Sequence, residues 1–114
     1  MPTPAIMILD DEPQVLNAVE RDLRQHYKSD YRIVKSSDGH EALEVLQKLK
    51  ERNTPVALFL VDQRMPRMSG TEFLDQARTF YPQARKVLLT AYADTQAAIN
   101  SINDIGLDYY LMKP

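Results

Sequence analysis

Short apolar runs alternate with longer amphipathic stretches along this chain. The apolar runs predict strands, and the stretches between them, in which apolar residues recur three or four positions apart, predict helices. The predicted strands are Ala5–Leu9, Tyr31–Lys35, Val56–Val61, Lys86–Thr90 and Asp108–Met112. The alternation of strand and helix, with crossovers long enough for parallel pairing, predicts a doubly wound α/β sheet.

Local signals mark where the predicted helices begin. Pro13 suits the first position of a helix that runs to Tyr27. The segments Asp38-Gly39-His40-Glu41 and Ser69-Gly70-Thr71-Glu72 each have the sequence of a capping box at the start of a helix. In the helix after Ser69, Phe73, Leu74 and Ala77 are expected to point inward. A fourth helix is predicted to be capped by Asp94.

Other signals mark where the elements end. Asn53-Thr54-Pro55 is expected to end the second helix, Tyr81-Pro82 the third and Gly106 the fourth. The chain stops at Lys113-Pro114, directly after the fifth strand, where a closing helix would be expected. We therefore expect residues 1–114 to be a single domain taken from a longer protein.

Composition narrows the possible classes of function. The chain has 114 residues, enough for one domain, and its formal net charge of −2 provides no basic field for nucleic acid or anionic lipid. It has no cysteine, which excludes disulfides, thiolate catalysis and cysteine-based zinc sites. His26 and His40 are interpreted as surface residues. No signal peptide and no apolar run long enough to span a bilayer is visible, so a cytoplasmic location is expected.

Polar residues stand at the ends of the predicted strands. Asp10-Asp11-Glu12 follows the first strand, Asp62 the third, Thr90 closes the fourth and Lys113 follows the fifth. In a doubly wound sheet these ends open on one edge, where ligands bind. Clustered carboxylates require a cation, and hard oxygen ligands select Mg²⁺ or Mn²⁺, which favour phosphate oxygens as partners. The pattern therefore indicates chemistry on a phosphoryl group, with an aspartate as nucleophile.

Each of these residues also has a simpler interpretation. Asp10 or Asp11 could cap the first helix, and Asp62 could be a turn residue before Met65-Pro66. Thr90 alone would be an ordinary strand residue and Lys113 a solvated lysine. The joint pattern favours a site, because four independent strand ends each present a side chain that one site would need.

The same residues carry a family resemblance. From Ile6 to Pro114 the chain resembles the receiver domain of two-component response regulators, of the chemotaxis-receiver-like superfamily. The matching motifs are Leu9-Asp10-Asp11-Glu12, Asp62-Gln63-Arg64-Met65-Pro66-Arg67-Met68-Ser69-Gly70, Leu89-Thr90-Ala91 and Asp108-Tyr109-Tyr110-Leu111-Met112-Lys113-Pro114. The fold that the resemblance implies is the flavodoxin-like five-stranded parallel sheet in the order 2-1-3-4-5.

The resemblance also implies roles for individual residues. Asp62 would accept a phosphoryl group from a histidine kinase or phosphotransfer protein. Asp11, Asp62 and the backbone carbonyl of Arg64 would bind Mg²⁺ directly, and Asp10 would act mainly through metal-bound water. The phosphoryl oxygens would be contacted by Thr90 and Lys113, and Thr90 and Tyr110 would form the conformational switch. Such a domain catalyses only its own phosphorylation and dephosphorylation, and it can be joined to an output domain or form a homodimer.

Three other classes of protein are alternatives to a receiver domain. A pseudo-receiver would be a pure interaction module without phosphotransfer. A magnesium-dependent phosphohydrolase of the haloacid dehalogenase kind would want Asp-x-Asp after the first strand, where this chain has adjacent aspartates. A flavodoxin would need a Ser/Thr/Gly-rich phosphate loop at that position, which the chain lacks.

Tyr92 provides a prediction from the sequence alone. By the resemblance, Arg64 and Tyr92 flank the path of the water that would attack the phosphorylated aspartate, and a bulky Tyr92 should slow that attack. Replacing it by Ala or Glu should therefore speed the loss of phosphate from the isolated domain, measured as the decay of the phosphorylated form. An unchanged rate would contradict this role for Tyr92.

Overall fold

A computed structural model describes residues 3–90 and 105–112 of the chain. It contains β1 (Ala5–Leu9), α1 (Pro13–Tyr27), β2 (Arg32–Ser36), α2 (Gly39–Glu51), β3 (Val56–Asp62), α3 (Gly70–Ala77), β4 (Arg85–Thr90) and β5 (Tyr109–Met112). The helix predicted after Asp94 lies outside the described residues. Strands and helices alternate from β1 to β4, and the predicted α/β class is confirmed.

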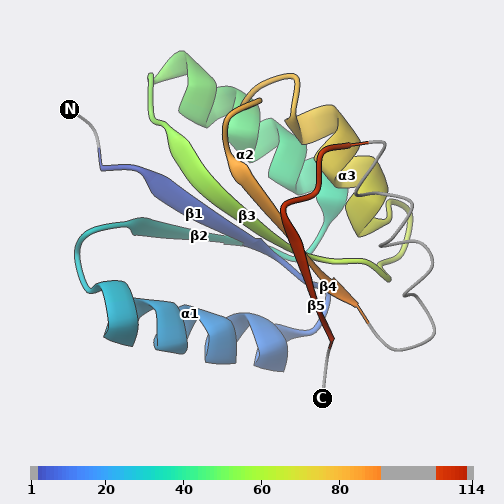
Figure 1. Ribbon diagram of the computed structural model, residues 1–114, viewed down its shortest axis with the longest axis horizontal. Coiled ribbons are helices and arrows are strands. Elements are labelled where there is room, and N and C mark those ends of the chain that lie inside the picture. The colour runs from blue at the N-terminus through green and yellow to red at the C-terminus, as the bar shows by residue number, and fades with distance from the viewer. Residues whose placement is uncertain (1–2, 91–104, 113–114) are drawn as a thin grey trace.

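All neighbouring strands pair in parallel, in the order β2-β1-β3-β4-β5. This is the order that the family resemblance implies. Figure 1 shows α1 on one face of the sheet and α2 and α3 on the other. Because every strand runs in the same direction, the carboxyl ends of β1, β3 and β4 meet at one edge.

The boundaries of the elements follow the predictions to within a few residues. Two elements, β1 and α1, have the predicted bounds. The second strand begins one residue later than predicted, at Arg32, whose backbone N–H donates to the Pro4 carbonyl. The third helix ends at Ala77, earlier than Tyr81-Pro82. There the Thr79 hydroxyl donates to the Gln76 carbonyl at 2.7 Å and competes with helical backbone pairing.

The helix starts were predicted from capping signals, with mixed results. The Ser69–Glu72 capping box is present in full at the start of α3. At α2 the Asp38 side chain accepts from the backbone N–H groups of His40 and Glu41, as a cap should. The Glu41 carboxylate, however, accepts from the Ser36 hydroxyl at 3.3 Å, and the Asp38 N–H also donates to that hydroxyl oxygen. The capping box predicted for Asp38–Glu41 is therefore wrong in one of its two bonds, because the Glu41 carboxylate accepts from the Ser36 hydroxyl and not from the Asp38 N–H.

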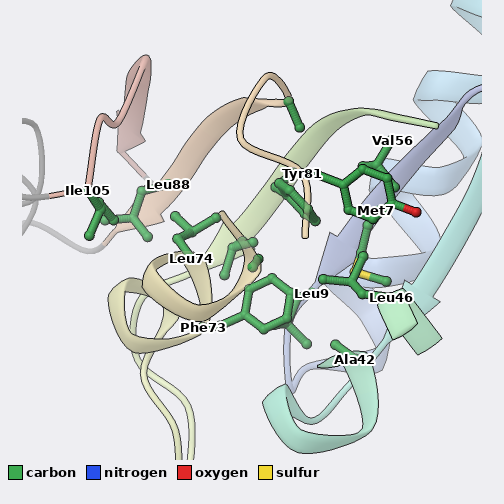
Figure 2. Close-up of a cluster of buried hydrophobic side chains, with 14 of the residues drawn as sticks. Met7, Leu9, Ala42, Leu46, Val56, Phe73, Leu74, Tyr81, Leu88 and Ile105 are labelled. Atoms are coloured by element: carbon green, nitrogen blue, oxygen red, sulfur yellow. The ribbon is translucent and has the colours of Figure 1, made fainter. Parts of the chain in front are cut away.

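The larger core lies between the sheet and the α2–α3 layer. Figure 2 shows side chains from β1, α2 and α3 that meet there, among them Met7, Leu46 and Phe73. Phe59 packs edge to face on Phe73, with ring centroids 5.8 Å apart. Such a pair adds roughly 1 kcal/mol beyond the area that the rings bury. Phe73, Leu74 and Ala77 are fully buried, which confirms the inward face predicted for α3.

The opposite face of the sheet is less covered near β5. Tyr109 and Leu111 are 61% and 43% exposed, and they pair in register with Val87 and Leu89, which are half-buried. His26 and His40 are both exposed, as predicted. Among the described residues, no helix combines the length and apolar character needed to cross a membrane.

Tyr81 generates a prediction about stability. It is 8% exposed, and its hydroxyl donates to the carbonyl of Thr54 at 2.7 Å, which ties the segment before β4 to the segment before β3. Tyr81→Phe should keep the ring packing but leave that buried carbonyl without its hydroxyl partner. We expect a loss of about 1 to 2 kcal/mol in the free energy of unfolding, measured by urea denaturation. Tyr109→Phe, at an exposed ring, is the matched control and should have little effect.

The same bond predicts a dependence on pH. Burial raises the pKa of the Tyr81 hydroxyl above 10.0, so the folded protein holds this proton more tightly than the unfolded chain does. The stability that Tyr81 contributes is present below the unfolded pKa and is lost as pH rises through the folded pKa. The difference in stability between wild type and Tyr81→Phe should therefore shrink above about pH 10. A constant difference across that range would contradict this assignment.

Candidate functional site

Three carboxylates meet at the carboxyl edge of the sheet. Asp10 and Asp11 directly follow β1, and Asp62 is the last residue of the neighbouring strand β3. One carboxylate oxygen of each lies within 4.8 Å of those of the other two. Asp10 and Asp62 are buried, at 0% and 3% exposure, whereas Asp11 is exposed. This arrangement, with two ligands inside and one at the surface, could hold a divalent cation that is reached from solvent.

The backbone around Asp10 holds its carboxylate in place. The Asp10 N–H donates to the Ser36 carbonyl at 3.2 Å, which extends the pairing of β1 with β2 by one residue. Its Oδ1 accepts from the Glu12 backbone N–H at 2.9 Å. The N-cap of α1 is Glu12, and it makes no side-chain capping bond. The N-cap is therefore neither Asp10 nor Asp11, although the Asp10 carboxylate accepts from the N–H of the N-cap residue.

The backbone of Asp62 is held by strand β4 and contacted closely by helix α3. Asp62 pairs in register with Leu89, and the next residue, Gln63, donates its N–H to the Leu89 carbonyl at 2.9 Å. Helix α3 approaches so closely that a Cβ at Gly70 would collide with the Asp62 carbonyl oxygen and lie 2.9 Å from its carbonyl carbon. Glycine is required there because there is no space for a side chain. Asp62 is a strand residue, not a residue of the following turn.

Thr90 ends β4, the strand beside β3, and is fully buried. It follows Leu89, the register partner of Asp62, so its position is one residue further along the same edge. Arg64 is exposed and lies two residues after Asp62. The structure therefore brings Asp10, Asp11, Asp62 and Thr90 to one edge, with the Arg64 backbone on the adjoining segment.

Three of the predicted site residues lie wholly or partly outside the part of the chain that the structure describes. Lys113 and Tyr92 lie outside the described residues. The backbone of Tyr110 belongs to β5 and pairs with Leu88, but its side chain is not described. Their predicted roles rest on the sequence.

Sequence reasoning missed the contacts that hold the segment after Asp62. Arg67, whose φ is 68°, forms an ion pair with Asp38 at the start of α2. Beside it, Met68 is buried, and a Cβ at Gly39 would lie 2.7 Å from its sulfur. The capping signal at Asp38 could be recognised in the sequence, but its partner 29 residues away could not.

The Asp38 carboxylate has a lowered pKa. The backbone N–H of Glu41 is the main cause, followed by the N–H of His40 and the positive charge of Arg67. The carboxylate is therefore ionised at neutral pH both as the cap of α2 and as the partner of Arg67.

Comparison with known proteins agrees with this geometry. The sequence profile of the family described as "Response regulator receiver domain" matches residues 6–114. The hydrogenase transcriptional regulatory protein HoxA of Cupriavidus necator is 30% identical over 96% of this chain, which corresponds to 21% of HoxA. The transcriptional regulatory protein ZraR of Klebsiella oxytoca is 32% identical over 96% of this chain and 23% of its own length. The chain thus spans less than a quarter of these two relatives.

Solved structures show the same fold. The adenylate cyclase from Rhodopirellula baltica superposes with a TM-score of 0.85 and 30% identity, covering 100% of this chain and 78% of that one. A CheY-like response regulator receiver domain protein from Methanospirillum hungatei has a TM-score of 0.80 and 28% identity, covering 97% and 82%. With its acidic cluster, its parallel sheet and its matching motifs, the chain belongs to the family of response regulator receiver domains, the signalling modules of two-component systems.

Proposed function

We propose that Asp62 accepts a phosphoryl group from the phosphohistidine of a histidine kinase or phosphotransfer protein, or from a small donor such as acetyl phosphate. The observation that carries the proposal is the placement of Asp62. It is a nearly buried carboxylate at the end of a central strand, within 4.8 Å of Asp10 and Asp11. A carboxylate in that position is a nucleophile with a cation site beside it.

The donor set suits Mg²⁺ or Mn²⁺. Carboxylate and carbonyl oxygens are the ligands these ions prefer, and the three carboxylates are close enough to share one ion. Asp11, Asp62 and the backbone carbonyl of Arg64 would bind it directly, and Asp10 through water. A bound cation would neutralise part of the charge on the phosphoryl oxygens.

The transfer is an in-line displacement at phosphorus. A carboxylate oxygen of Asp62 forms the new P–O bond while the P–N bond of the phosphohistidine breaks. The imidazole nitrogen leaves with the electron pair. With acetyl phosphate, the P–O bond to the acetyl group breaks and acetate leaves. The product is an acyl phosphate on Asp62, which water later hydrolyses.

The phosphorylated aspartate would be bound by Thr90 and Lys113, and Tyr110 would respond to it. Thr90 would donate its hydroxyl hydrogen to a phosphoryl oxygen, a role supported by its burial at the end of β4 beside the strand of Asp62. Lys113 would pair with a phosphoryl oxygen. Tyr110 would follow when Thr90 moves, so that the added charge biases a two-state surface.

Longer relatives are named as transcriptional regulatory proteins, and a similar solved structure is named as an adenylate cyclase. We propose that phosphorylation of this domain controls an output domain or a homodimer, in the cytoplasm, without direct contact with nucleic acid or membrane.

Phosphorylation is tested by mass spectrometry. Incubation with acetyl phosphate and Mg²⁺ should add the mass of one phosphoryl group to the wild type and none to Asp62→Asn. Peptide mapping should place the group on Asp62. A wild type that incorporates no phosphate or beryllofluoride would identify a pseudo-receiver, and turnover of phosphomonoesters would identify a hydrolase.

Metal binding is tested by calorimetry. Asp11→Asn removes one negative ligand at the exposed side of the cluster, so the affinity for Mg²⁺ should fall roughly tenfold or more, about 1.4 kcal/mol of binding free energy. Asp22→Asn, at an exposed position of α1, is the matched control and should bind as the wild type does. Equal Mg²⁺ affinities for the wild type and Asp11→Asn would contradict the assignment of Asp11 as a ligand.

A further inference from the structure

Gln63 directly follows Asp62, and both the oxygen and the nitrogen of its side-chain amide form hydrogen bonds with Thr71. Gln63 is 9% exposed. The Thr71 backbone N–H donates to its Oε1 at 2.9 Å, and its Nε2 donates to the Thr71 hydroxyl oxygen at 3.3 Å. Its backbone N–H donates to the Leu89 carbonyl, and its carbonyl accepts from the Gly70 N–H at 3.0 Å. Gln63 thus connects the end of β3 to both β4 and α3.

Gln63 also completes the start of α3. The first N–H groups of a helix have no partner within the helix and must find one elsewhere. In α3 the Glu72 N–H donates to the Ser69 hydroxyl oxygen, whereas the N–H groups of Gly70 and Thr71 both donate to Gln63. The capping box therefore satisfies only part of the helix start, and the residue after Asp62 satisfies the rest.

These bonds close the segment 64–69 at its base. The segment leaves the sheet at Gln63 and returns to it at Gly70, where the helix touches the Asp62 carbonyl. A shift of α3 relative to β3 would have to break the bonds to Gln63. The same bonds therefore limit movement of the Asp62 backbone and of the Arg64 carbonyl, which follows within the closed segment.

We infer that Gln63 is a positioning residue for phosphoryl transfer: its amide, clipped to Thr71, holds Asp62 and the segment 64–69 in the geometry that the reaction needs. This inference rests on the proposed function of Asp62. It assigns a role to a side chain that contacts neither the phosphoryl group nor a metal ion.

The chemistry of the amide explains why this residue type is suited to the position. The clip, meaning the two hydrogen bonds between the Gln63 amide and Thr71, needs an acceptor for the Thr71 N–H and a donor for the Thr71 hydroxyl oxygen. A neutral amide supplies both. A glutamate would lack the donor and would add a negative charge next to Asp62. A leucine of similar size would supply neither bond and would leave the N–H of the half-buried Thr71 without this partner.

The test compares Gln63→Leu with the wild type in rates of phosphorylation by acetyl phosphate, at saturating Mg²⁺. A carboxylate that is misplaced by less than an ångström reacts more slowly although the donor can still bind. We expect the maximal rate to fall roughly tenfold or more, with little change in the half-saturating concentration of acetyl phosphate. Thr71→Ser keeps both partners of the clip and should retain the wild-type rate. Hydrogen exchange at Gly70 and Thr71 should accelerate in Gln63→Leu.

Tyr81→Phe is the control for stability. It removes a buried hydrogen bond at the opposite edge of the sheet, so it should lower stability without lowering the maximal rate. A Gln63→Leu protein that reacts as fast as wild type and Tyr81→Phe would overturn the inference and leave the proposed function intact. A wild type that incorporates no phosphate would instead refute the proposed function, and the inference with it.

Discussion

Three carboxylates at one sheet edge repel one another, and the surrounding structure has to hold them together. The two buried members, Asp10 and Asp62, have carboxylate oxygens within 4.8 Å of each other, and like charges at that separation repel. Backbone pairing within the sheet holds Asp10 and Asp62 in place against this repulsion. Asp10 is bonded to the end of β2, and Asp62 is in register with β4. A cation would offset this repulsion, so the closeness of the three carboxylates is also what would let them share one metal ion.

The segment after Asp62 is anchored to several different elements of the fold. It leaves the sheet at Gln63, reaches α2 through the ion pair between Arg67 and Asp38, and returns at Gly70. Each anchor is on a different element, so the segment ties β3 to β4, α2 and α3. A charge added to Asp62 would act on a segment with few free directions of movement. That is the property a signalling site needs, because a rigid surrounding transmits a local change and a soft one absorbs it.

Stability and chemistry are separated along the strands. The Tyr81–Thr54 bond lies at the amino edge of the sheet, and the Phe59–Phe73 pair lies in the core above its middle. The carboxylates occupy the carboxyl edge, where backbone groups leave the sheet and side chains can converge. The buried aromatic contacts can therefore support the fold without placing apolar groups in the acidic cluster. This division explains why a substitution at Tyr81 is a fair control for one at Gln63.

The sequence by itself determined the α/β alternation, most of the element bounds, the Ser69 cap and the positions of Asp10, Asp62 and Thr90 at strand ends, because these depend on periodicity and on signals within a few positions. Tertiary structure decided the rest. That the Asp10 carboxylate lies close to that of Asp62 depends on the order of the strands, which places β1 beside β3. The roles of Gln63 and Arg67 could not be predicted, because their partners Thr71 and Asp38 become neighbours only once the helices have docked on the sheet.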